Sequence, residues 1–311
     1  MPYFVVDGAH KKEPVILMPG IARLSIDNLL KDILKARASG IKTILLFGIC
    51  PRGRKDAEGS YAYSTDSIVP QAVKAVKKAA RDMTVITDIC LCAYTSHGHC
   101  GILESPRHKV TKSHAKIDNK RTLEALSDMA LRHAEAGADY VAPSAMAKKQ
   151  VAAIRKILDK NGFRRTKIMG YSAKFASNFY GPFRNAAGSA PEFGDRSGYQ
   201  LDYKDRARAM KEIETDIKEG ADIVMVKPAL SYLDIIKEAS TKFRHPPLAA
   251  YNVSGEYAMV KAYCRDLGSG AKGQEAEKRL VLEILTGIKR AGADLIISYH
   301  AKDAVKWLDN N

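Results

Sequence analysis

The sequence predicts an α/β protein folded as one (β/α)8 barrel, the TIM-barrel architecture, and three observations support this. Four segments share a helix end, a glycine, a short turn and an apolar run. Further short apolar runs raise the number of expected strands to eight, and helical periodicity fills most of the gaps between them. The strand-bearing segments are 38–47, 135–144, 218–228 and 290–299, with Tyr3–Val6, Thr84–Ile89, Ile168–Tyr171 and Leu248–Asn252.

Each repeated segment is explained by local chemistry. The glycine supplies the left-handed backbone that ends a helix, and the apolar run after it is typical of a parallel strand covered on both faces. Three helices follow from apolar residues spaced for one face. These residues are Leu29, Leu30, Ile33 and Leu34, with Ser25 placed to cap the start; Ile68, Val69, Ala72, Val73 and Val76; and Leu280, Val281, Ile284, Leu285 and Ile288.

No linker or change in composition divides the chain, so residues 1–311 are expected to form a single domain. One long segment, about 175–203, is rich in Gly, Ser and Asn. Loops of that length are usually lids or binding loops. We therefore expect this segment to cover an active site.

Charge and hydropathy exclude several classes of protein. The net charge is +15, but Lys and Arg are spread along the expected helices without interleaved aromatic residues, as at 74–81. This pattern favours a solvated surface over a nucleic-acid partner. The chain has no apolar run of about 18 residues and no signal-type start, which predicts a cytoplasmic protein without a membrane partner.

Three of the five cysteines crowd into eleven residues, as Cys90-x-Cys92-x7-Cys100. Three thiolates can hold Zn²⁺ and leave its fourth position open, which is the arrangement of catalytic rather than structural zinc. The alternative is three reduced cysteines that only pack. His97 and His99 are also possible ligands, but a turn of this kind more often uses its imidazoles in local hydrogen bonds.

The remaining cysteines, Cys50 and Cys264, stand apart in the sequence. We expect both to be packed and inert.

The segment Ile223–Leu230 (IVMVKPAL) carries the first candidate catalytic residue. Its apolar run predicts a buried strand, and the proline after Lys227 keeps that lysine extended at the carboxyl end of the strand. Burial there lowers the pKa of an ammonium group and frees the amine to attack a carbonyl. The alternative is a lysine whose stem packs while its ammonium group reaches water.

A second lysine, Lys174, follows the fifth expected strand. Two ammonium groups close together lower each other's proton affinity, and neutral lysines form Schiff bases with ketones. Two such lysines suit an enzyme that activates two carbonyl molecules. The residues expected at the carboxyl ends of the strands, where barrel enzymes have their active sites, are Asp88, Cys90, Ser144, Lys174, Lys227, Tyr251, Ser254 and Tyr299.

Carboxylate-binding groups lie in the long loop between the lysines. Arg184, Arg196 and Gln200 together can clamp a carboxylate through charge-assisted hydrogen bonds, and Ser254 with Tyr299 can hold a second one. For any single arginine, an exposed position on the surface is the alternative.

Five motifs together resemble the porphobilinogen synthase family, also called 5-aminolevulinate dehydratase, and the likeness runs from about Tyr3 to Leu308. The resemblance implies a TIM-barrel lyase that joins two 5-aminolevulinate molecules into porphobilinogen, with loss of two waters, in tetrapyrrole (heme) biosynthesis. The motifs are DICLCAYTSHGHCGIL (88–103), YSAKFASNFYGPFRNAA (171–187), DIVMVKPALSYLDII (222–236), YNVSGEYAMVKA (251–262) and AGADLIISY (291–299).

The resemblance also implies roles for residues. Lys227 is expected to form a Schiff base with the substrate that ends on the propionate side, whose carboxylate meets Ser254 and Tyr299. Lys174 is expected to bind the other substrate. Its carboxylate partners would be Arg184, Arg196 and Gln200. The other implied roles are zinc ligation by Cys90, Cys92 and Cys100, contact with the amines by Asp88 and Ser144, and pocket walls from Tyr180, Phe183 and Tyr251.

The chain departs from the family pattern in three places. The family usually has SDMMDGR where this chain has Ser144–Gln150 (SAMAKKQ), and His300 stands where Phe or Tyr is common. Because Met1 falls almost at the first strand, an N-terminal arm is not expected. We therefore predict a homo-oligomer smaller than the family's octamer, a dimer or hexamer. Glu219 matches a glutamate of an allosteric Mg²⁺ site found in some branches.

Three other functions remain open at this point. A Schiff-base class I aldolase would need one essential lysine and no metal. A basic, nonenzymatic nucleic-acid-binding protein with structural zinc would need a fourth protein ligand. The third is an inactive barrel that kept these residues but lost activity through the altered 145–150 loop. An activity assay would distinguish it from the active enzyme.

Overall fold

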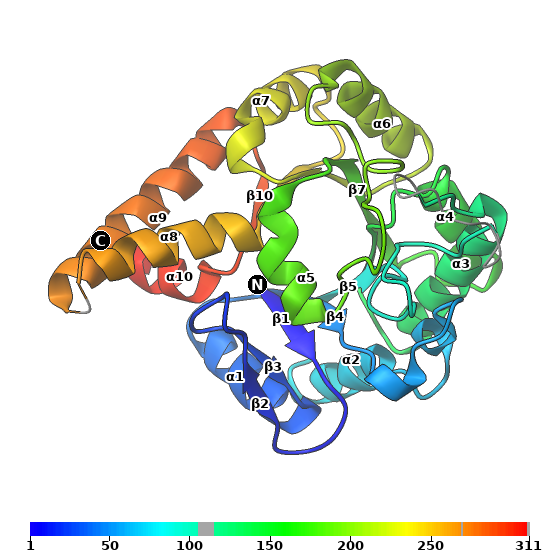
Figure 1. Cartoon of the computed structure of the whole chain (residues 1–311), viewed down its shortest axis with the longest axis horizontal. Helices are drawn as coiled ribbons and strands as arrows, with labels where there is room; N and C mark the ends of the chain where they lie inside the picture. Colours follow the sequence, from blue (N-terminus) through cyan, green and yellow to red (C-terminus); the bar gives the residue numbers. More distant parts are fainter. Residues whose placement is uncertain (105–114, 269, 310–311) are drawn as a thin grey trace.

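The computed structural model describes residues 1–104, 115–268 and 270–309 and contains a ring of parallel strands surrounded by helices (Figure 1). All eight expected strands are present, and each pairs in parallel with the next along the chain. They are β1 (Pro2–Val5), β4 (Thr43–Gly48), β5 (Thr84–Ile89), β6 (Tyr140–Pro143), β7 (Lys167–Lys174), β8 (Ile223–Lys227), β9 (Leu248–Asn252) and β10 (Leu295–Ser298).

The ring encloses a continuous apolar core. Every one of these strands contributes a buried residue to it, and the rings of Phe4 on β1 and Tyr299 just after β10 stack with centroids 6.1 Å apart. The two ends of the sheet therefore meet, which confirms the (β/α)8 barrel. The inward residues from the strands are Phe4, Leu45, Phe47, Ile86, Ala142, Met169, Tyr171, Ile223, Met225, Ala249, Tyr251 and Ile297.

Ten helices are present in the described residues, and most of them cover the outside of the barrel (Figure 1). They are α1 (Ile26–Ala38), α2 (Ile68–Ala79), α3 (Asn119–Glu135), α4 (Gln150–Lys160), α5 (Gly181–Ala187), α6 (Arg206–Lys218), α7 (Leu233–Lys242), α8 (Ser254–Asp266), α9 (Ala271–Ala291) and α10 (Ala301–Asp309). None of the described helices combines the length and hydropathy needed to cross a membrane.

Two details of the expected helix α1 are wrong. Leu34 is exposed, because it lies at the edge of the buried stripe formed by Leu29 and Ile33. Ser25 occupies the predicted cap position but gives no side-chain cap, because its hydroxyl oxygen instead accepts from the backbone N–H of Lys11 at 2.9 Å. The five expected core residues of α2 are all buried.

Two further features lie outside the expected pattern. A hairpin of β2 (Lys12–Pro14) and β3 (Ala22–Leu24) adds to the sheet beside β1. The segment 175–203 is partly helical, since a short 3-10 turn at Asn178–Tyr180 leads directly into α5. In Figure 1, α5 lies over the centre of the ring.

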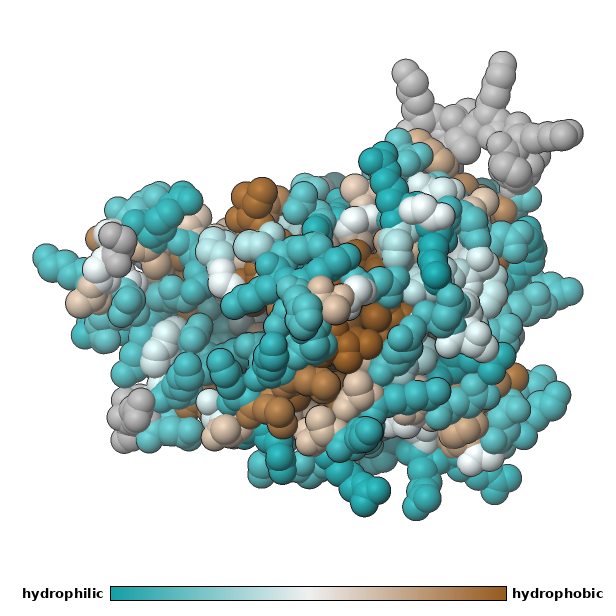
Figure 2. Space-filling view, turned by 90° about the horizontal axis from the view of Figure 1, so that it is seen from below, coloured by the Kyte–Doolittle hydropathy of each residue, from teal (hydrophilic) through white to brown (hydrophobic). Residues whose placement is uncertain are grey.

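Hydrophilic side chains cover most of the face seen in Figure 2 and surround a smaller hydrophobic area. On this face, the distribution agrees with the expectation of a solvated surface.

Candidate active site

The two candidate lysines end neighbouring strands. Lys174 is the last residue of β7, Lys227 is the last residue of β8, and the two are register partners in the sheet. Both are buried, and both ammonium groups face the ring of Tyr171, at 5.5 Å for Lys174 and 5.0 Å for Lys227. The structure therefore brings the two amines to the same side of the barrel, at the carboxyl ends of neighbouring strands.

Lys227 is enclosed by aromatic rings. Its Nζ lies 4.2 Å from the ring centroid of Tyr251, 5.2 Å from that of Tyr180 and 5.3 Å from that of Phe183. Burial, together with the nearby charge of Lys174, lowers the pKa of Lys227 to about 7. A substantial fraction of this amine is therefore neutral at physiological pH.

Lys174 faces a more polar wall. Its ammonium donates to the carbonyl oxygen of Ser144 at 2.5 Å. Asp88, near the end of β5, lies close by. Burial raises the pKa of Asp88 to about 6, against the opposing charge of Lys174. One of its carboxylate oxygens, Oδ1, is buried without a hydrogen-bond partner.

Cys90, Cys92 and Cys100 converge beside this wall, and their sulfur atoms lie within 4.8 Å of one another. All three are buried. Hydrogen bonds from the other two thiols hold the pKa of Cys100 well below its usual range, so the group can carry a thiolate. Three soft sulfur donors at one point fit a tetrahedral Zn²⁺ with an open position.

The two histidines in the same turn bond elsewhere. The His97 ring pairs with the carbonyl oxygen of Ala57 at 3.1 Å, and the His99 ring pairs with that of Phe193 at 3.1 Å and with the hydroxyl of Tyr199 at 3.3 Å. The imidazoles are used in hydrogen bonds, but these partners are distant in the sequence; the expected local bonding is limited to the backbone N–H of His99, which donates to His97 Nδ1 at 3.1 Å.

The expected carboxylate clamp lines a cavity of about 240 Å³ formed by residues of the 175–203 segment, with Arg184, Arg196 and Gln200 in its wall beside Asp195 and Asp202. Arg196 donates to the carbonyl oxygens of Gly98 at 2.9 Å and Ser189 at 2.5 Å. Its Nε, the Nε of Arg184 and both amide atoms of Gln200 are buried without a partner. Buried polar atoms in this state are costly, so the cavity suits a polar, anionic ligand.

The second expected carboxylate site is differently arranged. The Ser254 hydroxyl accepts from the backbone N–H of Phe183 at 3.0 Å and donates to the carbonyl oxygen of Phe179 at 3.1 Å. The hydroxyls of Tyr251 and Tyr299 are 3.3 Å apart. Ser254 therefore fastens the 3-10 turn and α5 to the barrel.

Tyr171 is the main residue of the site that the sequence analysis did not single out. It is completely buried, and among the residues that the structure describes it is the one ring that both ammonium groups face. Its position inside a buried strand, three residues before Lys174, was the available signal.

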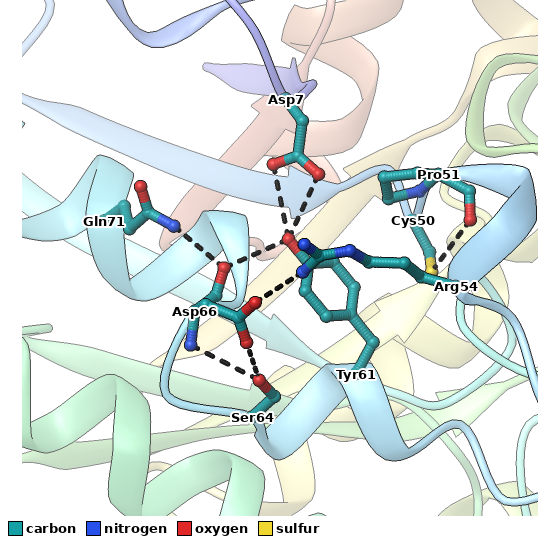
Figure 3. Close-up of polar contacts among 8 residues, drawn as sticks. All are labelled: Asp7, Cys50, Pro51, Arg54, Tyr61, Ser64, Asp66 and Gln71. Carbon is teal, nitrogen blue, oxygen red and sulfur yellow. Dashed lines mark hydrogen bonds and ion pairs between the residues drawn. The ribbon is translucent and has the colours of Figure 1, made fainter.

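Cys50 lies outside the sulfur cluster, in the polar cluster of Figure 3. The hydroxyl of Tyr61 donates to the carboxylate of Asp7, which follows β1, and the Arg54 guanidinium pairs with Asp66 at 2.5 Å. These contacts hold the loop after β4 in place. Burial raises the pKa of Cys50 to about 11, so this thiol is poorly suited to binding a metal.

The departures from the family pattern have local contacts. In the altered loop, Met146 and Lys149 adopt left-handed backbone, and nothing in the structure explains how the loop compensates for the missing carboxylates. The His300 ring lies with its centroid 4.4 Å from that of Tyr257. Burial, with a smaller contribution from the charge of Lys261, lowers the pKa of His300 to about 3. Glu219 accepts from the N–H of Ala152 at 3.1 Å, in the first turn of α4, and the magnesium site stays a prediction.

The comparisons with known proteins agree over the whole chain. The family model described as "Delta-aminolevulinic acid dehydratase" matches residues 1–307. The enzyme of that name from Bacillus subtilis strain 168 is 46% identical over 307 residues, which cover 99% of this chain and 89% of the relative. The one from Synechococcus elongatus is 50% identical over 310 residues, covering 99% and 90%.

Among solved structures, the Toxoplasma gondii ME49 enzyme in complex with its product porphobilinogen matches with a TM-score of 0.92 and 40% identity, covering 100% of this chain and 84% of that one. QR15, an aldolase, shares the fold alone, at 12% identity and a TM-score of 0.50. The chain therefore belongs to the delta-aminolevulinic acid dehydratase family, the hydro-lyases also called porphobilinogen synthases.

Proposed function

We propose that the delta-aminolevulinic acid dehydratase activity of this chain proceeds through two lysine imines, one at Lys227 and one at Lys174. The observation that carries the proposal is the register pairing of the two lysines, with both ammonium groups against the ring of Tyr171. Two substrate ketones held at these amines lie side by side, which converts an encounter of two molecules into a reaction within one site.

At Lys227, the neutral amine attacks the ketone carbon of one 5-aminolevulinate. The carbonyl oxygen leaves as water, and a carbon–nitrogen double bond joins substrate and lysine. The surrounding rings of Tyr180, Phe183 and Tyr251 exclude water, which favours the neutral amine and protects the imine from hydrolysis. Lys174 activates the second substrate in the same way.

The carboxylate of the substrate at Lys174 binds in the cavity with Arg184, Arg196 and Gln200. The unpartnered N–H groups of these three side chains support this assignment, because a carboxylate supplies the acceptors that they lack. Ser254 and Tyr299 are the proposed partners of the other carboxylate, and binding it requires the Ser254 hydroxyl to exchange one of its bonds to Phe179 and Phe183. This orientation points both ketones towards the lysines.

Asp88 and Ser144 handle protons at the substrate amines. With a pKa of about 6, the buried Asp88 carboxyl can both accept and return a proton near neutral pH. Its contact with the Ser144 hydroxyl and its closeness to Lys174 support this role.

Cys90, Cys92 and Cys100 would hold zinc. When bound, Zn²⁺ acts as a Lewis acid, which polarises a substrate carbonyl or lowers the pKa of a water molecule. The thiolates also stabilise the positive charge of the neighbouring Arg196, whose pKa they raise against the cost of burial.

Borohydride reduction in the presence of 5-aminolevulinate, followed by peptide mass spectrometry, tests the proposal. We expect reduced adducts on both Lys227 and Lys174, together with chelator-sensitive formation of the pyrrole in a colorimetric assay. A single trapped lysine and turnover indifferent to thorough chelation would instead indicate aldolase-like chemistry. The predicted dimer or hexamer is a separate question for light scattering.

A further inference from the structure

β7 contains one residue more than its partner strand requires. Met169 and Gly170 pair with Ile223 and Val224 of β8, and the register then shifts, so that Ala173 pairs with Val226 and Lys174 pairs with Lys227. Two residues of β7, Tyr171 and Ser172, therefore stand opposite the single residue Met225. This is a β-bulge.

The bulge decides which way Lys174 points. Without it, the pairing of Gly170 with Val224 would continue until Ala173, not Lys174, stood opposite Lys227. Side chains alternate between the two faces of a strand, so a shift by one residue moves a side chain to the other face. Met169 and Tyr171 lie in the barrel core, whereas Ala173 belongs to the cluster under the outer helices.

Helix α6 supplies a buried carboxyl at this bulge. Asp216 packs against β7, within hydrogen-bonding range of the Ser172 hydroxyl, and is only 8% exposed. A Cβ atom at Gly170 would lie 2.7 Å from Asp216 Oδ2, so the glycine makes the close approach possible. The single proton of the Ser172 hydroxyl can go either to Asp216 or to the carbonyl oxygen of Gly170, which lies 3.3 Å away. Burial raises the pKa of Asp216 to about 7.

We propose that Asp216 is a positioning residue for Lys174. Its carboxyl, seated against Gly170 and Ser172, holds the bulge that turns Lys174 and Lys227 to the same side of the barrel. Asp216 lies on the outer face of β7, so it affects Lys174 through the backbone of that strand and does not contact the substrate. This inference rests on the proposed role of Lys174 as an imine-forming residue.

The test compares borohydride trapping at the two lysines in the full-length chain incubated with 5-aminolevulinate. The measured quantity is the ratio of reduced adduct at Lys174 to reduced adduct at Lys227. Small misplacements of a reacting group cost up to about a hundredfold in rate. We therefore expect Asp216→Ala to lower the ratio at least about tenfold while the Lys227 adduct remains.

Two companion variants make the result specific. Asp216→Asn keeps the size and the hydrogen bond of the carboxyl, so it should hold the ratio within about twofold of the unsubstituted chain. Ile213→Ala, the matched control, removes buried volume from the same helix and leaves the Asp216 carboxyl in place; its ratio should be unchanged. Gly170→Ala crowds the contact from the strand side and should lower the ratio even if Asp216→Ala does not fold.

An unchanged ratio in folded Asp216→Ala, or an equal fall in Ile213→Ala, would overturn the inference. Absence of a Lys174 adduct in the unsubstituted chain would overturn the proposed function, and the inference with it. The two failures are therefore distinguishable, because only the second shows in the unsubstituted chain.

Discussion

The surroundings of Lys227 and those of Lys174 differ in packing and in hydrogen bonding. Around Lys227, aromatic rings fill the space, and the side chain is packed before any ligand arrives. On the side of Lys174, buried polar atoms of Asp88, Arg184 and Gln200 have no hydrogen-bond partner. Each such atom costs about 1–3 kcal/mol, so this half pays a stability penalty that a ligand can remove.

The difference indicates a division of labour. The half with Lys227 tunes an amine through burial alone, so its chemistry is set by the fold. The half with Lys174 depends on what it binds, which we propose to be a carboxylate and a metal ion. Substitutions in the first half should change reactivity and pH dependence, while substitutions in the second should change affinity.

The largest effect is expected from Lys227→Met. Turnover should fall at least about a thousandfold, because the nucleophile is lost. The folded protein should nevertheless become more stable at pH 7. The pKa of Lys227 falls from 10.5 to about 7 on folding, so its burial lowers the free energy of unfolding by up to a few kcal/mol.

The sign of this effect can be checked against pH. Between about pH 7 and 10.5 the unfolded chain binds more protons at Lys227, so the cost shrinks as pH rises through this window. The stability gain of Lys227→Met in thermal melts should therefore be largest at or below pH 7 and should fade towards pH 10. A gain independent of pH would contradict the assigned cause.

Next in size is the loss of a sulfur ligand. Cys92→Ser should weaken zinc binding at least about tenfold, measured by metal analysis after dialysis, because a hydroxyl is a poor replacement for a thiolate. Cys50→Ser is the matched control, since in the described part of the chain the thiol of Cys50 hydrogen-bonds to the carbonyl oxygen of Pro51 in its own loop and lies outside the sulfur cluster. Equal zinc loss in both variants would contradict the assignment of ligands.

Arg196→Lys should raise KM for 5-aminolevulinate by roughly tenfold and change kcat less, because lysine keeps the charge but cannot make the planar, bidentate contact. The exposed Arg81→Lys serves as the control and should behave like the unsubstituted enzyme. A fall in kcat with unchanged KM would mean that Arg196 affects reactivity, as the residues around Lys227 do, rather than substrate affinity.

The smallest expected change is in the pH profile. If the neutral form of Lys227 is required, kcat/KM should rise with pH and level off above about 7. Tyr251→Ala opens the ring enclosure to water and weakens the desolvation that lowers this pKa. The midpoint should then move upward by about one pH unit. A downward shift of the midpoint would mean that the Tyr251 ring had mainly stabilised the positive charge of Lys227 through a cation–π interaction.

Sequence reasoning found much of this site because its signals are local. The proline after Lys227 and the spacing of the three clustered cysteines are visible in a few residues, and parallel strands bring their carboxyl ends to one edge. The β7 bulge could not be seen, since Gly170 and Ser172 blur the alternation that would mark an extra residue. The contact of Asp216 with that bulge joins separate elements and has no local signature.

The rings packed around Lys227 have an optical consequence. Near-ultraviolet circular dichroism of Tyr171, Tyr180 and Tyr251 depends on their fixed surroundings, so imine formation at the central amine should alter that signal. The single tryptophan, Trp307, packs with the separate cluster of α8 and α9. Its fluorescence reports on the packing of these outer helices. The two signals together can therefore separate imine formation at Lys227 from structural changes around α8 and α9.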